Sequence, residues 1–287
     1  MRRWWWLFAL AGCGFHPPGQ SLQPAEPGDA SPDTAPPPPT IDADLGAWGS
    51  ASALFAGVGD DDPTLTGDLL QVFFNREGGI WVSTRGSAGD MFGDPVEVSE
   101  LSTGLETTPE ISNDGLTMYF SSSRAPSDGN DDVWMSTRAT GSATWSAPIH
   151  VAALSSSSND LSPTVSADGL ALVMSRDPTG SLDLYESTRA TTSDTWGTLV
   201  ALTAINSSST DEDPILSLDQ LAIYYDSTRD GDYQLWMATR ASTADEFGSA
   251  TKITSANTLG AETDPWISPD SRHLFFASNG TLYQVSR

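Results

Sequence analysis

The sequence predicts an all-β fold, a five-bladed β-propeller over residues 45–287 that is closed by an outer strand from its amino-terminal side. Three observations predict it. A motif of about 50 residues occurs five times, each copy holds short aromatic and β-branched runs typical of strands, and no segment has helical periodicity. Strand-only repeats of this length cannot bury their own faces until they pack against neighbours, which is typical of propeller blades.

A proline marks the same point in each repeat, at spacings of 46, 54, 51 and 51 residues. The prolines are Pro63, Pro109, Pro163, Pro214 and Pro265. Three residues later each copy has serine or threonine, and five residues later it has Asp68, Asp114, Asp168, Asp219 or Asp270. We interpret these segments as tight turns between the first and second strands, in which the aspartate accepts backbone N–H groups.

Three further strands follow each turn. The second strand is an apolar block such as Val72-Phe73-Phe74. The third carries one aromatic residue, Trp81, Trp134, Tyr185, Trp236 or Tyr283, and ends in Arg85, Arg138, Arg189, Arg240 or Arg287. The fourth is expected to begin at Phe92-Gly93, Trp145-Ser146, Trp196-Gly197 or Phe247-Gly248. We interpret the third-strand aromatics as fillers between blades, with sugar binding as the alternative.

The fifth repeat reaches Arg287 after only three strands. The segment Trp48-Gly49-Ser50 has the pattern of a fourth strand and precedes the first repeat. We therefore expect residues 45–55 to complete the last blade, which fixes the number of blades at five.

The segment Thr263–Asp270, followed by Leu274–Ser278, resembles the WD40-like repeat of the TolB carboxy-terminal propeller. The other four copies are looser versions. The resemblance implies a docking surface in envelope complexes, often with a peptidoglycan-associated lipoprotein. The sequence differs from TolB in having no separate amino-terminal α/β domain and five blades instead of six, so TolB's particular partners are not carried over.

The amino terminus predicts export. Arg2 and Arg3 precede a short apolar run, which is too short for a membrane span of roughly 20 residues and typical of a signal peptide over residues 1–12. Leu10-Ala11-Gly12-Cys13 resembles the bacterial lipobox, which implies that Cys13 is acylated, with palmitate as a typical chain, and anchors the protein. An ordinary secretory signal with an incidental cysteine is the alternative. Gly14 is not the aspartate that favours inner-membrane retention, so the resemblance implies the outer membrane.

Residues 13–44 contain the lipidated cysteine and a proline-rich stretch with almost nothing apolar to bury. Such chain favours extended conformations, and we expect a disordered tether between membrane and propeller. A proline-motif ligand is the alternative. Because Cys13 is the only cysteine, no intramolecular disulfide is expected.

The chain is strongly acidic, with 13 basic and 38 acidic residues and a net charge of −25. Such a charge disfavours nucleic acid and anionic lipid as partners and favours basic proteins, cationic sugars or divalent ions. The alternative is that the acidity only keeps an exported domain soluble.

Three residues before each proline lies a carboxylate, and we name this set the carboxylate ring: Asp60, Glu106, Asp160, Asp211 and Glu262. We expect it near the channel mouth, on the same face as Arg76, Arg124, Arg176 and Arg229. One interpretation is a binding site for a cationic ligand, with calcium as a candidate although no calcium loop is present; the other is ion pairing within or between blades. The fifth blade has Asn279-Gly280 in place of the arginine, so Glu262 lacks the repeated partner.

The arginines that end the third strands are predicted to pair with the turn aspartates. In an up-and-down blade the first turn and the end of the third strand lie on the same side. A guanidinium and a carboxylate there would form a bidentate pair, worth about 1 kcal/mol where partly exposed.

The sequence thus favours a monomeric, lipid-anchored protein of the bacterial envelope whose propeller binds a protein or a glycan and has no catalytic role. A lectin-like propeller is the second hypothesis and a glycoside hydrolase the third. A hydrolase needs two carboxylates in different surroundings, which should break the repeat, whereas the prominent acids recur in every copy. No Ser, Cys or His arrangement for nucleophilic catalysis can be assembled.

Overall fold

The computed structural model describes residues 46–55, 59–127 and 130–287. The predictions for the signal peptide, for Cys13 and for the tether lie outside these residues. Within the described ranges, no helix has the length and apolar character needed to cross a membrane.

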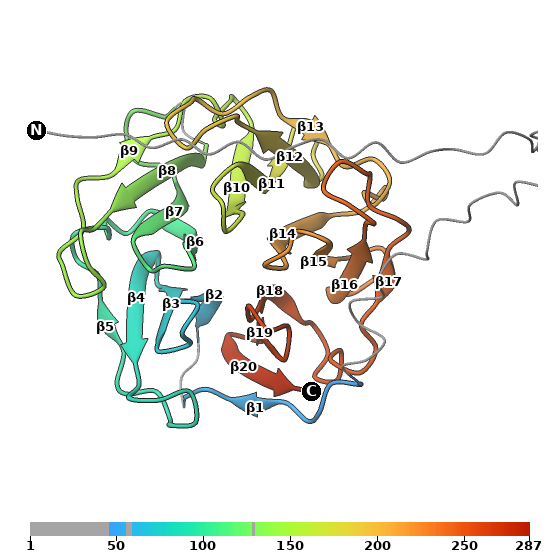
Figure 1. Cartoon of the computed structure of the whole chain (residues 1–287), viewed down its shortest axis with the longest axis horizontal. Coiled ribbons are helices and arrows are strands. Elements are labelled where there is room, and N and C mark those ends of the chain that lie inside the picture. Colours follow the sequence, from blue (N-terminus) through green and yellow to red (C-terminus); the bar gives the residue numbers. More distant parts are fainter. Residues whose placement is uncertain (1–45, 56–58, 128–129) are drawn as a thin grey trace, which may run out of the picture. The chain divides into compact units, whose positions relative to one another are not determined.

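The described strands form five four-stranded antiparallel sheets around a central axis (Figure 1). Blade one consists of β2 (Asp60–Leu65), β3 (Gln71–Arg76), β4 (Gly79–Thr84) and β5 (Val96–Glu97). Blade two consists of β6 (Glu106–Ile111), β7 (Thr117–Ser122), β8 (Asp132–Thr137) and β9 (Ile149–His150). Blade three consists of β10 (Asn159–Val165), β11 (Ala171–Asp177), β12 (Asp183–Thr188) and β13 (Val200–Ala201). Blade four consists of β14 (Asp211–Leu216), β15 (Ala222–Ser227), β16 (Gln234–Thr239) and β17 (Thr251–Lys252). The predicted five-bladed propeller is confirmed.

The two ends of the propeller meet in blade five, as predicted. This blade consists of β18 (Thr263–Ile267), β19 (His273–Ser278), β20 (Thr281–Ser286) and β1 (Ser52–Ala53). β1 pairs with β20 in antiparallel register, and the backbone N–H of Gly49 donates to the carbonyl of Ser286 at 2.8 Å. Figure 1 shows β1 beside β20 at the outer edge of the blade. An amino-terminal strand thus fastens the ring.

The outer strands are shorter than predicted and begin later. Each has only two residues, and the aromatic residue expected to start it precedes the paired segment. That aromatic ring instead packs under the arginine that ends the third strand, at 4.3 Å for Arg85 and Phe92 and at 4.1 Å for Arg189 and Trp196. A cation over an aromatic face is attracted by the ring quadrupole, so this contact fixes the outer segment in every blade.

The predicted pairs between these arginines and the turn aspartates are replaced by another arrangement. The guanidinium Nε of Arg138 donates to the carbonyl of Gly115, one residue after Asp114, and Arg189 repeats this with Gly169. The turn aspartate accepts instead from inside the turn, and Asp114 Oδ1 takes the hydroxyl of Ser112 at 2.6 Å. Since that oxygen also accepts the N–H of Leu116, the turn satisfies its aspartate locally.

The core lies between neighbouring blades and is built mainly from the second strands. Phe73 and Phe74 of β3 are 0–1% exposed, and Tyr224 and Tyr225 of β15 are fully buried. Consecutive side chains of a strand point to opposite faces of its sheet. Each second strand therefore fills the interfaces on both sides of its blade, and no blade is stable without its neighbours.

Candidate functional site

The innermost strand of every blade contains a β-bulge at the repeated proline. In blade one the register of β2 against β3 shifts between Asp61 and Thr64, and equivalent shifts occur in the other four. Proline has no N–H to donate, so it fits only at a sheet edge or a bulge, and these strands provide both. The residue before each proline adopts a left-handed backbone, with φ between 46° and 54°. These residues are Asp62, Thr108, Ser162, Asp213 and Asp264.

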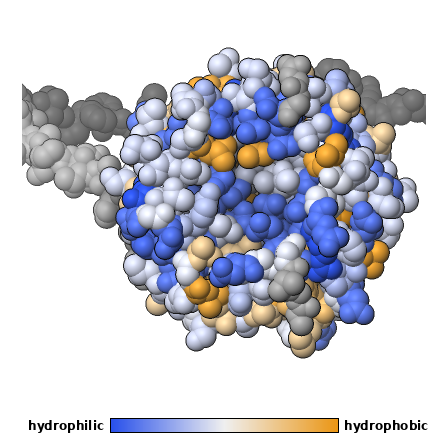
Figure 2. Space-filling model, turned by 180° about the vertical axis from the view of Figure 1, so that it is seen from behind, coloured by the Kyte–Doolittle hydropathy of each residue, from blue (hydrophilic) through white to orange (hydrophobic). Residues whose placement is uncertain are grey.

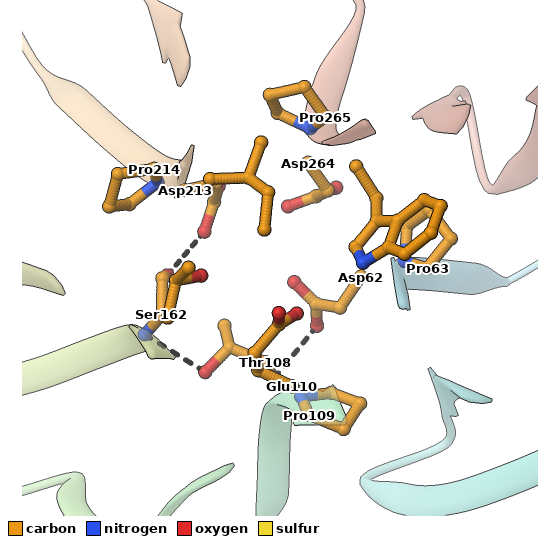
Figure 3. A pocket seen from close by; sticks show the side chains of 13 residues that line it. Asp62, Pro63, Thr108, Pro109, Glu110, Ser162, Asp213, Pro214, Asp264 and Pro265 are labelled. Atoms are coloured by element: carbon orange, nitrogen blue, oxygen red, sulfur yellow. Dashed lines mark hydrogen bonds between the residues drawn. The ribbon is translucent and has the colours of Figure 1, made fainter. Parts of the chain in front are cut away.

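The bulge turns these five residues toward the axis, where they line a cavity of about 40 Å³ (Figure 3). Hydrogen bonds join them from blade to blade. The N–H of Thr108 donates to Asp62 Oδ2 at 3.0 Å, and the N–H of Ser162 donates to Thr108 Oγ1 at 3.0 Å. The hydroxyl of Ser162 donates to Asp213. The backbone N–H of Thr108 thus holds the carboxylate of Asp62, and the hydroxyl of Ser162 holds the carboxylate of Asp213.

Three of the five residues are aspartates, and we name Asp62, Asp213 and Asp264 the axial carboxylates. One oxygen from each lies within 4.8 Å of the others. Burial is the main cause that raises the pKa of Asp264 well above its usual value, and the charges of Asp61, Asp213 and Asp62 raise it further. The pKa of Asp62 is raised well above its usual value by burial and then by Asp61 and Asp213. Three carboxylates so placed repel one another unless protons or a cation neutralise them.

Further acids surround the axial carboxylates. Glu212, Asp213 and Asp226 form a second group whose ligand atoms lie within 4.8 Å of one another. Burial, followed by the charge of Asp213, raises the pKa of Glu212 to about 8. Glu110 also lines the axial cavity, and its burial raises its pKa to about 8, although a 2.7 Å hydrogen bond from Thr64 opposes this.

The carboxylate ring lies beside this site and not in it. Its five members are at most 1% exposed and do not line the axial cavity. Four of them form ion pairs with the second-strand arginines, Asp60 with Arg76 at 2.6 Å and Glu106 with Arg124 at 2.5 Å. The other two pairs are Asp160 with Arg176 and Asp211 with Arg229. Ion pairing is thus present in blades one to four, while a role of the ring in ligand binding stays a prediction.

The fifth member, Glu262, is held differently. Its Oε1 accepts the backbone N–H groups of Leu259 and Gly260, and its Oε2 accepts the side-chain amide of Gln234 at 3.0 Å. Neutral donors therefore replace the arginine that blade five lacks. The negative charge of Glu262 stays uncompensated by an ion pair within the described residues.

The third-strand aromatic rings pack against the second-strand arginines that pair with the carboxylate ring. The guanidinium of Arg76 lies 5.0 Å from the ring centroid of Trp81, and that of Arg229 lies 4.8 Å from Trp236. In blade five, where the arginine is missing, Tyr283 stacks on Phe276 at 5.9 Å. These contacts support the interpretation of the aromatics as fillers.

The repeat pattern predicted no functional role for the residue before each proline. A usable signal was nevertheless present, because three acids break the repeat. At the position of Asp226 the other blades have Asn75, Ser121, Ser175 and Ala277, and Glu110 and Glu212 are equally unmatched by acids at most of their equivalents. Of these three acids, Glu110 lines the axial cavity, and Glu212 and Asp226 form the second acidic group with Asp213.

Solved structures of low sequence identity share this fold. A protein assigned as TolB from Agrobacterium tumefaciens is 19% identical over 76% of this chain and 69% of that chain, with a TM-score of 0.51. An endo-arabinase from Bacteroides thetaiotaomicron is 14% identical over 83% and 97% of the two chains, with a TM-score of 0.58. An α-L-arabinofuranosidase from Podospora anserina is 12% identical over 84% and 96%, with a TM-score of 0.57. The similarity to the TolB propeller is therefore confirmed as one of fold, which enzymes share.

No protein-family model and no curated protein matches the sequence.

Proposed function

We propose that this chain is a lipid-anchored protein of the bacterial envelope whose propeller binds another protein and has no catalytic role. The observation that carries the proposal is the distribution of open space. The axial cavity, where propeller carboxylates gather, has about 40 Å³, whereas a groove between blades two and three has about 540 Å³. Small-molecule sites usually have about 300–1,000 Å³, so the axis is too small to enclose a sugar ring.

The crowding of the axial carboxylates also bears on the hydrolase alternative. One oxygen from each lies within 4.8 Å of the others, so the three groups repel one another. A catalytic acid and a catalytic base need different surroundings and different pKa values, whereas burial raises the pKa of Asp62, Asp213 and Asp264 alike. This similarity supports a binding module over the hydrolase alternative.

The groove between blades two and three has the chemistry of a peptide-binding surface. Its floor includes Tyr119, Met135 and Val165, and its rim carries Asp114, Asp168 and Asp194 with one basic residue, Arg189. A second groove of about 290 Å³ lies between blades three and four. Figure 2 shows hydrophilic residues around the centre of one face, with apolar residues in small separate patches. Net acidity around a partly apolar floor favours an extended basic segment of the partner.

A charge-reversal pair tests the proposal. Asp194→Lys changes the rim of the groove, whereas Asp90→Lys changes the corresponding loop of blade one, which lines neither groove. The two aspartates have matched surroundings, since Asp194 accepts the hydroxyl of Thr191 and Asp90 that of Ser87, both at 2.9 Å. We expect envelope proteins cross-linked to the wild-type chain to be lost in Asp194→Lys and kept in Asp90→Lys.

The alternatives give different results in parallel assays. Binding on a glycan array that Asp194→Lys abolishes would support a lectin, and release of aryl arabinosides or other aryl glycosides would support a hydrolase. A set of cross-linked partners that is identical for both variants would contradict the groove as the binding surface.

A further inference from the structure

Two buried carboxylate oxygens near the axis accept no hydrogen bond from an N–H or hydroxyl donor among the described residues: Oδ2 of Asp264 and Oδ2 of Asp226. Asp264 is 8% exposed and Asp226 is fully buried. The other oxygen of Asp226 accepts the backbone N–H of Asp264 at 3.1 Å, which holds the two residues together. A buried anionic oxygen without a donor is unfavourable, so it needs a positively charged partner or a proton.

The axial carboxylates converge on one point from three blades. Asp62, Asp213 and Asp264 belong to blades one, four and five, and Figure 3 shows their carboxyl groups directed into the same cavity. One oxygen from each lies within 4.8 Å of the others. Two oxygens bound to one calcium ion at about 2.3–2.6 Å can be at most about 5 Å apart. The observed separation therefore fits three ligands of a single ion.

We infer that Asp62, Asp213 and Asp264 form a calcium site on the propeller axis. The group offers only oxygen ligands, which suit hard cations and not zinc or copper. Calcium accepts irregular geometry with six to eight oxygens, whereas magnesium requires a near-ideal octahedron. A cavity of about 40 Å³ has room for one ion and one or two waters to complete its coordination.

The ligands are positioned by groups that do not bind the ion themselves. The N–H of Thr108 holds Asp62, the hydroxyl of Ser162 holds Asp213 and the carboxylate of Asp226 holds the backbone of Asp264. Two of the axial carboxylates therefore keep their orientation by hydrogen bonds to their own side chains. The axial carboxylates are not members of the carboxylate ring and do not line the groove, so the inference does not depend on the proposed function.

Protons are the competing way to relieve the repulsion. Burial and neighbouring charges raise the pKa of Asp62 and of Asp264, and a protonated Asp264 can share its proton with Asp62 or Asp213. A cation neutralises all three groups at once. It would also join blades one, four and five across the junction where the ring closes, so binding should stabilise the whole propeller.

Calorimetry and thermal unfolding of the EDTA-treated full chain test the inference, with Ca²⁺ and Mg²⁺ at matched ionic strength. We expect one Ca²⁺ per chain and a melting temperature raised by at least about 5 °C at saturation, because a ligand that binds only the folded state stabilises it. Asp264→Asn keeps the side-chain volume but removes one negatively charged ligand. This change should weaken calcium binding by about tenfold or more.

Two further variants keep the result interpretable. Asp232→Asn removes the same charge from an exposed site and should bind calcium like the wild type. Asp62→Asn replaces a second proposed calcium ligand. It serves as the test variant if circular dichroism shows that Asp264→Asn does not fold. Protonation alone predicts no calcium response and overturns the inference. An equal response to Mg²⁺, or calcium affinity unchanged in both ligand variants, overturns it as well.

Discussion

The guanidinium of Arg287, the last residue, lies 4.1 Å from the ring centroid of Trp48, at the start of the described chain. The same distance separates Arg189 from Trp196 within blade three. The two ends of the propeller thus reproduce a contact that other blades make between residues close in sequence. This relationship identifies Trp48 as the blade-five member of the repeat.

Loss of the Trp48 side chain should therefore unfasten the ring. Trp48 and Trp196 are both 7% exposed, and replacing either by alanine should lower the free energy of unfolding by about 3–5 kcal/mol. Only Trp48→Ala should also release residues 45–55 to proteolysis, since the segment after Trp196 stays attached at both ends. Limited proteolysis with mass spectrometry distinguishes them. Equal cleavage patterns for the two variants would contradict closure by the amino-terminal strand.

Truncation gives an independent measurement of the same closure. Removal of residues 14–44 should leave the melting temperature almost unchanged. Removal of residues 14–55 should lower it by several degrees, because β20 then becomes an unpaired sheet edge. Differential scanning calorimetry compares the two proteins. Coinciding melting temperatures would show that β1 adds nothing to stability.

The blades could be predicted from the sequence because every repeated residue has a local role. The turn serine and aspartate bond to each other, and the third-strand arginine caps the aromatic residue that follows it. The axial site could not be predicted in the same way. The proximity of Asp62 and Asp264 requires ring closure, and their direction toward the axis depends on a left-handed backbone before proline. Neither property follows from residue types at a fixed spacing.

The turn aspartates are a case in which the sequence predicted an interaction that the structure replaces by another. Matching arginines and aspartates on one side of the blade predicted salt bridges. The hydroxyl two residues before each aspartate is closer and needs no long side chain to be ordered, as the 2.6 Å bond from Ser268 to Asp270 illustrates. Local side-chain hydrogen bonds in a turn therefore outcompeted the long-range charge pair.

Breaking one buried ion pair of the carboxylate ring should destabilise the propeller. Asp160 is fully buried, and Asp160→Asn would leave Arg176 without its anionic partner, at a cost of about 3–5 kcal/mol. Glu262→Gln should cost less, since its donors are neutral amides. Chemical denaturation measures both. A more stable Asp160→Asn protein would instead indicate repulsion within the ring, as a cationic binding site would require.

Stability without divalent cations should fall as the pH rises, and Glu110 should account for part of the change. Its folded-state pKa is about 8, above the unfolded value of 4.5, so the folded state binds the extra proton between these values. Each unit of pH in this window then removes up to about 1.4 kcal/mol of stability, and less where the groove admits solvent. Glu110→Gln should flatten the profile of melting temperature from pH 5 to 9 in EDTA. The exposed Glu246→Gln serves as the control and should keep the wild-type slope.

Membrane attachment should depend on Cys13 alone. The segment Leu10-Ala11-Gly12-Cys13 predicts acylation of Cys13, and the apolar run before it is too short to span a bilayer. Wild-type protein should therefore incorporate labelled palmitate and fractionate with the outer membrane, whereas Cys13→Ser should do neither. Because the chain has a single cysteine, any label that persists in Cys13→Ser cannot be on sulfur. Washing the membranes with salt separates an acyl anchor, which resists it, from electrostatic adsorption, which does not. A Cys13→Ser protein that stays with salt-washed membranes, together with a wild type that takes up no palmitate, would show that the chain is held there by something other than a lipid.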